Sequence, residues 1–519
     1  MLPMETIRSN PRRSVPTGLI AATIALALLA ACTGGGSSPS GSPATSSVAV
    51  AVADRFPHCD FQPPPKGWRC GLVAVPLDRA DPAAGTIPLN VNVLPHSDTS
   101  TPAGEPVFMI SGGPGDSGYT FGTWSVAPIL HAHHDVVWLD PRGTGNSDAI
   151  DCEPLQQGWT SPARMHAAFT ACATQLGGTS DRYGSGDVAL DLDEVRAFLG
   201  YERIDLLPQS YGAVVAQAYA ARFPDHVHAI VFDAGFPADD PDASYWWSQD
   251  YPKAYIRVDQ LICDRQPGCD VHVAADIAYL ARTLRASPVA GLGRPQHGRP
   301  RHVVVDEAAF VTLMMAGKDL GPLPPEPIGE IATALRAGDH QPLLDAAATL
   351  PPGMPSYGDP AQESAGASAA AWCTDWAGTG WDPSGSLAER RQQFARTVAA
   401  FPATTFAPFS RDGWVGSIWG WYGACLTWPA PDRLDPPIPA GSVTPQVPTL
   451  LLVGDEDLNT PIEMVRRLLA VYPQARIVTV AGAGHPVMDP AWAGCAPKIT
   501  ERFFDTLDAG DTACASHLR

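Results

Sequence analysis

The stretch Ile204-Asp205-Leu206-Leu207-Pro208-Gln209-Ser210-Tyr211-Gly212-Ala213 decides the fold of this chain. A short apolar run is followed by one serine and then by small residues, which predicts a strand, a tight turn and a helix. Strain on such a turn holds a serine hydroxyl above a sheet edge, as in a nucleophile elbow. Gly212 is small, as the turn requires, whereas Pro208 stands where the pattern has glycine. The alternative is an ordinary strand-to-helix loop, so the interpretation depends on whether the chain supplies catalytic partners.

Apolar strands and amphipathic helices alternate on both sides of this elbow. Alternation of this kind predicts an α/β fold, with a mostly parallel sheet and helices on both faces. An antiparallel pair is expected at 71–77 and 86–94, and further strands are expected at 105–110, 135–139, 228–233, 447–453 and 476–480.

The alternation stops between about Pro241 and Pro445, where Trp, Pro and Ala are frequent and helical patterns appear. We therefore expect a mainly helical cap domain inserted into the sheet domain. The predicted organisation is a signal peptide at 1–31, a flexible tether at 32–52, the first part of the core at 53–240, the cap at 241–445 and the second part of the core at 446–519.

The N-terminus predicts export. Three arginines precede an apolar run from about Leu19 to Ala31, which is too short to span a bilayer comfortably and is typical of a secretory signal. The run ends in Leu29-Ala30-Ala31-Cys32, which resembles the lipobox of bacterial lipoproteins. We expect lipidation of Cys32 and anchoring outside the cytoplasm; the alternative is an uncleaved membrane anchor.

The charge balance argues against nucleic acid as a partner. The formal net charge is -20, from 34 basic and 54 acidic residues. Without Glu5 and the three arginines of the signal, 31 basic and 53 acidic residues leave -22. A surface this acidic repels phosphate backbones. The sequence does not indicate an oligomeric state.

Ten cysteines remain after Cys32, an even number in a chain expected to be exported, so disulfides are the default. Nearest-neighbour spacing suggests the pairs Cys59–Cys70, Cys152–Cys172, Cys263–Cys269, Cys373–Cys425 and Cys495–Cys514. Zinc is disfavoured because no C-x-x-C pair is present. We expect no metal and no cofactor; the glycine-rich run at 112–118 lacks the Lys-Ser/Thr of a phosphate loop.

Two later loops supply candidate partners for Ser210. Asp457 follows the strand expected at 447–453, with Asp455 as the reserve, and His485 lies in a glycine-flanked loop after the strand expected at 476–480. Thr460, Pro461 and Glu463 suggest a capping box at the start of the next helix. Each candidate follows the carboxyl end of a strand, where open α/β sheets build their sites. Serine, acid and histidine also occur in the chain order of α/β-hydrolases.

The chain resembles the prolyl-iminopeptidase family of α/β-hydrolases, in its secreted tripeptidyl-aminopeptidase-like branch from actinobacteria. The resemblance rests on five stretches and on the cap cysteines Cys373 and Cys425. The stretches are Cys70-Gly71-Leu72-Val73-Ala74-Val75-Pro76-Leu77-Asp78, Gly112-Gly113-Pro114-Gly115, Asp140-Pro141-Arg142-Gly143-Thr144-Gly145-Asn146-Ser147, Ser210-Tyr211-Gly212, and Asp457-Leu458-Asn459-Thr460-Pro461 with Gly484-His485. Ser111 and Pro208 depart from the family pattern.

This resemblance implies a serine peptidase that acts on free N-termini. Ser210 would attack a carbonyl, His485 would take its proton and Asp457 would orient the imidazole, while the amides of Tyr211 and Gly113 receive the oxyanion. A carboxylate of the cap would bind the substrate amine, with Glu326, Glu330 and Asp375 as candidates. Rival hypotheses are a carboxylesterase or lipase acting on ester substrates, and an inactive homologue that binds in the cell envelope.

Overall fold

The computed structural model describes residues 56–59, 66–118, 126–240, 249–320, 325–350, 356–417, 421–433, 435–489 and 494–517. The predicted signal peptide, Cys32 and the predicted tether lie outside these residues, as does the side chain of Glu326. None of the helices within these ranges combines the length and the apolar character needed to cross a membrane.

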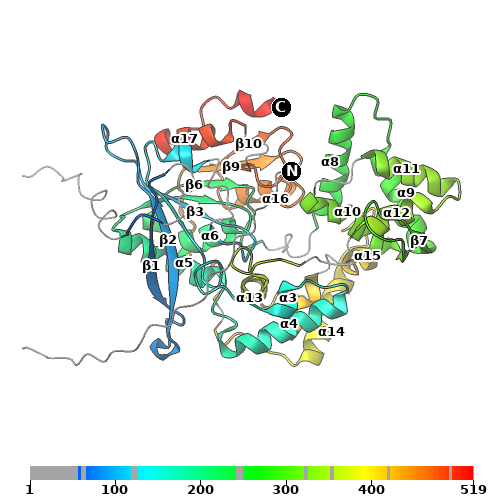
Figure 1. The fold of residues 1–519 in the computed structure, drawn as a ribbon, viewed down its shortest axis with the longest axis horizontal. Helices are drawn as coiled ribbons and strands as arrows, with labels where there is room; N and C mark the ends of the chain where they lie inside the picture. The colour runs from blue at the N-terminus through cyan, green and yellow to red at the C-terminus, as the bar shows by residue number, and fades with distance from the viewer. Residues whose placement is uncertain are drawn as a thin grey trace, which may run out of the picture. The chain divides into compact units, whose positions relative to one another are not determined.

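The described residues form an eight-stranded sheet in the order β1-β2-β4-β3-β5-β6-β9-β10 (Figure 1). Its antiparallel pairs are β1 with β2 and β2 with β4, and every pair from β4 to β10 is parallel. This confirms the predicted α/β class. The strands are β1 (Arg69–Pro76), β2 (Thr86–Leu94), β3 (Val107–Ile110), β4 (Val136–Leu139), β5 (Ile204–Pro208), β6 (Val227–Asp233), β9 (Thr449–Gly454) and β10 (Arg476–Val480).

Alternating side chains of each strand build two separate cores. Phe108 and Ile110 of β3 belong to one buried cluster, whereas Val107 and Met109 belong to the other. Helices α5 and α6 contribute to the first cluster, and α2 and α17 contribute to the second. The wholly apolar strands are therefore covered on both faces, as parallel sheets require. The helices of this domain are α2 (Ala127–Leu130), α3 (Glu153–Gln156), α4 (Pro162–Leu176), α5 (Ser185–Leu199), α6 (Gly212–Arg222), α16 (Ile462–Val465) and α17 (Ala496–Thr506).

Between β6 and β9 the described chain adds no strand to the main sheet. The helices of this segment are α8 (Tyr251–Arg265), α9 (Val273–Ala286), α10 (Glu307–Leu320), α11 (Pro325–Arg336), α12 (Gln341–Thr349), α13 (Ala365–Asp375), α14 (Leu387–Ala400) and α15 (Arg411–Val415), followed by the 3-10 helix η4 (Trp421–Thr427). The segment also contains an antiparallel hairpin of β7 (Val289–Gly293) and β8 (Arg301–Val305).

Arg142 explains the Asp-Pro-Arg-Gly run that follows β4. Its guanidinium binds Asp191 of α5 with two hydrogen bonds, Nε at 2.7 Å and Nη2 at 2.6 Å. It also donates to the carbonyls of Pro76, Leu77 and Arg182 at 2.8–3.1 Å. Such a bidentate, fully buried pair ties β1, the loop after β4 and α5 together, which is a structural role.

Candidate active site

Ser210 stands between β5 and α6 with a φ of +52°, a strained left-handed conformation for a residue with a side chain. Gly212 opens α6 against β3, and a Cβ there would lie 2.5 Å from the carbonyl oxygen of Ile110. A Cβ on Gly112 would lie 3.0 Å from that of Ser210. Small residues thus let strand, turn and helix approach closely, which is the packing of a nucleophile elbow.

Pro208 ends β5 without disrupting it. It pairs in register with Ile110 of β3, and the next residue, Gln209, donates its amide to the Ile110 carbonyl at 3.0 Å. Because proline is tolerated where a strand ends, its presence in place of glycine leaves the turn at Ser210 formed.

Asp457 and His485 are brought together at the carboxyl end of the sheet. Oδ2 of Asp457 lies 2.9 Å from Nδ1 of His485. The carboxylate is fully buried, and its Oδ1 accepts the amides of Asn459 at 2.8 Å and Thr460 at 2.9 Å. These two amides fix the orientation of the carboxylate, with Oδ2 toward the His485 ring.

Thr460 belongs to the site and not to a helix cap, so the predicted capping box is wrong. Helix α16 begins two residues later, with Pro461 at its N-cap. The Thr460 hydroxyl donates to the carbonyl of Ala234 at 2.7 Å and lies 3.1 Å from both Asp457 Oδ2 and His485 Nδ1. The sequence suggested a cap because it could not show that these groups meet in space.

Asp455, the reserve acid, is engaged elsewhere. It forms an ion pair with Arg265 of α8, and its Oδ1 accepts the amide of Gly482 at 2.9 Å. Arg265 also pairs with Glu456 at 2.5 Å. The geometry therefore favours Asp457 as the partner of His485.

Helix α8 is attached to the loop that carries Asp457. The Tyr251 hydroxyl donates to the carbonyl of Asn459 at 2.5 Å. Arg257 donates through Nε to the Glu463 carboxylate at 2.7 Å and through Nη1 to the carbonyl of Asp455 at 2.8 Å. Helix α8 is thus fixed to the loop that carries Asp457 at the edge of the sheet, a connection that sequence reasoning missed.

Asp233, at the end of β6, links the serine turn to the histidine loop. It accepts the amides of Val487 at 2.8 Å and Met488 at 3.2 Å, and the side-chain amide of Gln209 at 3.1 Å. Burial raises its pKa to about 6, against the lowering effects of the Gln209 hydrogen bond and the His485 charge. Among the described residues, no hydrogen bond joins the Ser210 hydroxyl to the His485 ring. The serine turn and the histidine loop are connected instead through Asp233, which binds Gln209 on one side and Val487 and Met488 on the other.

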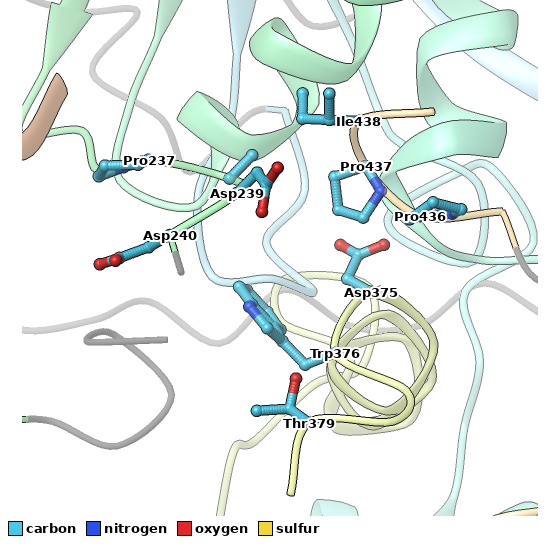
Figure 2. Close-up of a pocket in the computed structure, with 10 residues that line it drawn as sticks. Pro237, Asp239, Asp240, Asp375, Trp376, Thr379, Pro436, Pro437 and Ile438 are labelled. Atoms are coloured by element: carbon cyan, nitrogen blue, oxygen red, sulfur yellow. The ribbon is translucent and has the colours of Figure 1, made fainter. Parts of the chain in front are cut away.

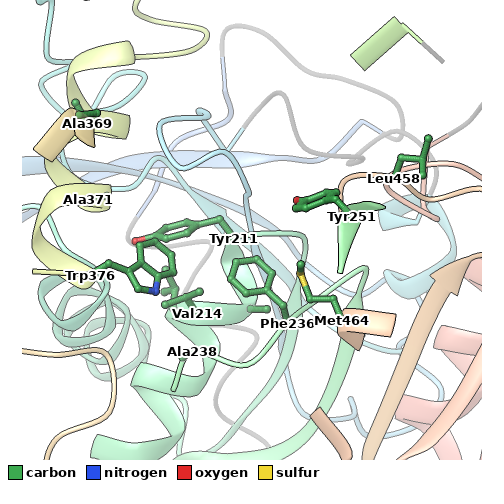
Figure 3. Close-up of a cluster of buried hydrophobic side chains, with 14 of the residues drawn as sticks. Tyr211, Val214, Phe236, Ala238, Tyr251, Ala369, Ala371, Trp376, Leu458 and Met464 are labelled. Atoms are coloured by element: carbon green, nitrogen blue, oxygen red, sulfur yellow. The ribbon is translucent and has the colours of Figure 1, made fainter. Parts of the chain in front are cut away.

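The two residues expected to form the oxyanion hole lie on different loops, Gly113 after β3 and Tyr211 after β5. Gly113 has a φ of +99°, and a Cβ there would lie 2.8 Å from the amide nitrogen of Gly115. Tyr211 directly follows Ser210, and its ring packs 6.2 Å from that of Trp376 (Figure 3). Backbone amides on both sides of a reacting carbonyl are what an oxyanion requires.

Asp375 holds Tyr211 and is not a free amine-binding group. One of its oxygens accepts the Tyr211 hydroxyl, and the other accepts the amide of Ser185 at 2.9 Å and its hydroxyl at 3.0 Å. Burial raises the pKa of Asp375 to about 6. Glu330 lies exposed on α11. Neither residue has the geometry expected of the predicted amine site.

Asp375 and Trp376 also border a pocket of about 180 Å³ (Figure 2). Its lining combines carboxylates, one indole and several prolines: Pro237, Ala238, Asp239, Asp240, Asp375, Trp376, Thr379, Pro436, Pro437 and Ile438. Because Arg467 lies 3.5 Å from Asp240, part of this negative charge is already paired.

The five disulfides of the structure join the same cysteines as the nearest-neighbour pairs. Cys373–Cys425 connects α13 to η4 across 52 positions of sequence. This bridge fastens the helix that carries Asp375, and thereby supports Tyr211.

Comparison with known proteins agrees with this architecture. Residues 105–260 match the family described as alpha/beta hydrolase fold, and residues 412–514 match the one described as TAP-like protein. The tripeptidyl aminopeptidase of Streptomyces coelicolor is 27% identical over 489 residues, which cover 87% of this chain and 84% of that protein. Serine protease Hip1 of Mycobacterium tuberculosis is 28% identical over 261 residues, covering 46% of this chain and 49% of Hip1. The chain therefore belongs to the α/β-hydrolases, in their tripeptidyl-aminopeptidase-like branch.

Proposed function

We propose that the protein is a serine aminopeptidase that releases single residues or short peptides from free N-termini. The family assignment and the relatives named as tripeptidyl aminopeptidase and serine protease support a serine peptidase. The observation that carries the proposal is the 2.9 Å contact between Asp457 Oδ2 and His485 Nδ1, at the sheet edge where the Ser210 elbow stands.

The proposed mechanism uses these three side chains in sequence. Hydrogen bonding of Nδ1–H to Asp457 leaves Nε2 of His485 as the base. Nε2 takes the hydroxyl proton as Ser210 Oγ attacks the substrate carbonyl, and the amides of Tyr211 and Gly113 receive the oxyanion. The intermediate expels the amine, which takes the proton from Nε2. Water then attacks the acyl-enzyme as Nε2 takes its proton, and Nε2 returns this proton to Ser210 Oγ as the acid product leaves.

Replacing Ser210 by alanine tests this proposal. We expect the S210A protein to fold normally and to lose about 10⁴-fold or more in kcat on aminoacyl and peptidyl anilides, together with fluorophosphonate labelling. Full residual activity, or labelling of another residue, would contradict the assignment. Activity of the parent protein on short esters but not on any amide with a free N-terminus would favour the esterase hypothesis.

We also propose that the protein is exported and anchored through lipid on Cys32. The basic and apolar N-terminal pattern and the lipobox-like residues 29–32 support this, as do five disulfides, which persist in oxidising compartments. A C32A protein should move from the membrane fraction to the soluble fraction and lose incorporation of labelled fatty acid. Unchanged membrane association and labelling would contradict the anchor.

A further inference from the structure

Asp116 places a carboxylate beside the proposed oxyanion position. It lies on the glycine-rich loop after β3, and its Cγ is 3.3 Å from the position of a Cβ built on Gly113. The loop is fixed on both sides of Asp116. Ser117 donates its amide to the carbonyl of Gln362 at 3.0 Å, and Ser364 donates its amide to that of Gly115 at 2.9 Å. The backbone of Asp116 is therefore held next to Gly113.

The Asp116 carboxylate lacks the hydrogen bonds that the buried acids Asp233, Asp375 and Asp457 receive. Within the described residues, Ser111 Oγ donates to the backbone carbonyl of Asp116 at 3.2 Å, and no group donates to its carboxylate. Asp116 is partly exposed. Desolvation by the surrounding protein nevertheless raises the pKa of its carboxyl group to about 6, against the lowering effect of the His485 charge. The Asp116 carboxylate thus lies beside Gly113 with unused acceptor capacity.

A negative charge here affects different substrates in opposite ways. As the oxyanion develops, an ionised carboxylate beside Gly113 opposes it, because like charges repel in a poorly solvated site. An ester or an N-blocked peptide offers no compensating charge. A substrate with a free α-ammonium group neutralises the carboxylate and removes the penalty.

The position also limits which ammonium group can reach Asp116. The amine of the residue that owns the scissile carbonyl is two bonds from the carbonyl carbon. In a tripeptidyl substrate the free amine is two residues further away, and each extended residue adds about 3.3–3.6 Å. A carboxylate packed against Gly113 therefore suits the amine of the acyl residue itself.

We propose that Asp116 binds the α-ammonium group of the residue whose carbonyl is attacked, and that the protein consequently prefers to release single N-terminal residues. This inference rests on the proposed function and narrows its substrate class. Asp116 takes the part expected of Glu326, Glu330 or Asp375 in the cap, and of these Asp375 already uses both oxygens and Glu330 is exposed.

The test compares the full chain with its D116N and D116A variants. E330Q, which removes an exposed acid of α11, is the control for the loss of one negative charge. Four fluorogenic or chromogenic substrates are used: alanyl-aminomethylcoumarin, its N-acetyl form, trialanyl-aminomethylcoumarin and p-nitrophenyl butyrate. For both Asp116 variants we expect kcat/KM on the alanyl amide to fall about 100-fold. The butyrate rate should stay within about threefold or rise, and E330Q should match the parent.

Other outcomes separate the two levels of the proposal. Equal losses of kcat/KM on all four substrates would mean that Asp116 only supports the loop. If the parent prefers the trialanyl amide and D116N keeps that preference, the ammonium group binds elsewhere. Either result overturns the inference and leaves the aminopeptidase function standing. A parent active on the butyrate alone would instead refute the proposed function. Circular dichroism and melting curves verify that the variants are folded.

Discussion

The side chains of Asp233 and Gln209 are hydrogen-bonded at 3.1 Å, and Gln209 directly precedes Ser210, the proposed nucleophile. The same carboxylate accepts the amide of Val487 at 2.8 Å, two residues after His485. One buried acid at the end of β6 therefore sets the distance between the serine turn and the histidine loop. Since it contacts neither substrate nor reacting atoms in the proposed mechanism, Asp233 is a positioning residue.

We predict that D233N lowers kcat by about 100-fold with a small change in KM. An amide in place of the carboxylate turns a donor toward Val487, Met488 or Gln209, and a displacement near 1 Å in a catalytic group costs about this much. Steady-state kinetics on an aminoacyl anilide measures kcat and KM separately.

D205N is the matched control for this variant. Asp205 is also a fully buried acid, at the opposite end of β5 from the elbow, where it binds His228 at 2.8 Å. It should lose stability without the selective loss of kcat. Equal kinetic losses in D233N and D205N would show a general effect of burial and refute the positioning role.

Much of the sheet was predictable because its buried strands consist largely of apolar residues. The apolar runs expected at 228–233 and 476–480 correspond to β6 (Val227–Asp233) and β10 (Arg476–Val480). The small residues after Ser210 likewise indicated α6. Such features depend on local pattern and on two-sided burial, which a sequence displays directly.

Features that depend on distant partners were not predictable. Thr460 is a residue type that often caps helices, but its hydroxyl donates to the carbonyl of Ala234, 226 positions away. Asp233 gives no signal as a link between Gln209 and Val487, and Asp375 gives none as the partner of Tyr211. The β7–β8 hairpin was also missed, although β8 carries the β-branched run Val303-Val304-Val305. These contacts exist only after the chain has folded.

We predict that G212A disrupts the elbow, whereas G178A does not. A Cβ on Gly212 would lie 2.5 Å from one backbone oxygen and 2.8 Å from the next, those of Ile110 and Ser111, and backbone moves less readily than side chains. Overpacking of this kind costs about 1–3 kcal/mol of unfolding free energy and should displace Ser210. Gly178 has no atom within 4 Å of such a Cβ. Urea unfolding and kcat should both distinguish the variants; equal behaviour would contradict the close approach.

We predict that D259N stabilises the protein increasingly as pH rises. Asp259 of α8 is fully buried, neither oxygen has a hydrogen-bond partner among the described residues, and burial raises its pKa to about 8. The folded state thus holds a proton that the unfolded state releases near pH 4, so this group lowers stability by up to about 1.4 kcal/mol per pH unit between pH 4 and pH 8. Asparagine removes this dependence.

Melting curves of the parent and D259N across this pH range provide the measurement. Their difference should be smallest near pH 4, grow with pH and level off above pH 8. A constant difference across the range, or a parent that is more stable than D259N at pH 8, would show that Asp259 is not an unpaired acid.

We predict that loss of the Cys373–Cys425 disulfide costs more stability than loss of Cys263–Cys269. The pairs are 52 and 6 positions apart, and loop-closure entropy assigns them about 4 and about 2 kcal/mol. The longer bridge also fastens α13, whose Asp375 holds Tyr211 next to Ser210, the proposed nucleophile, so its removal should lower kcat as well. Paired alanine substitutions, compared by urea unfolding and by anilide kinetics, test both effects. Equal stability losses would contradict the entropic ranking, and an unchanged kcat in the Cys373/Cys425 double variant would show that α13 keeps Tyr211 in place without the bridge.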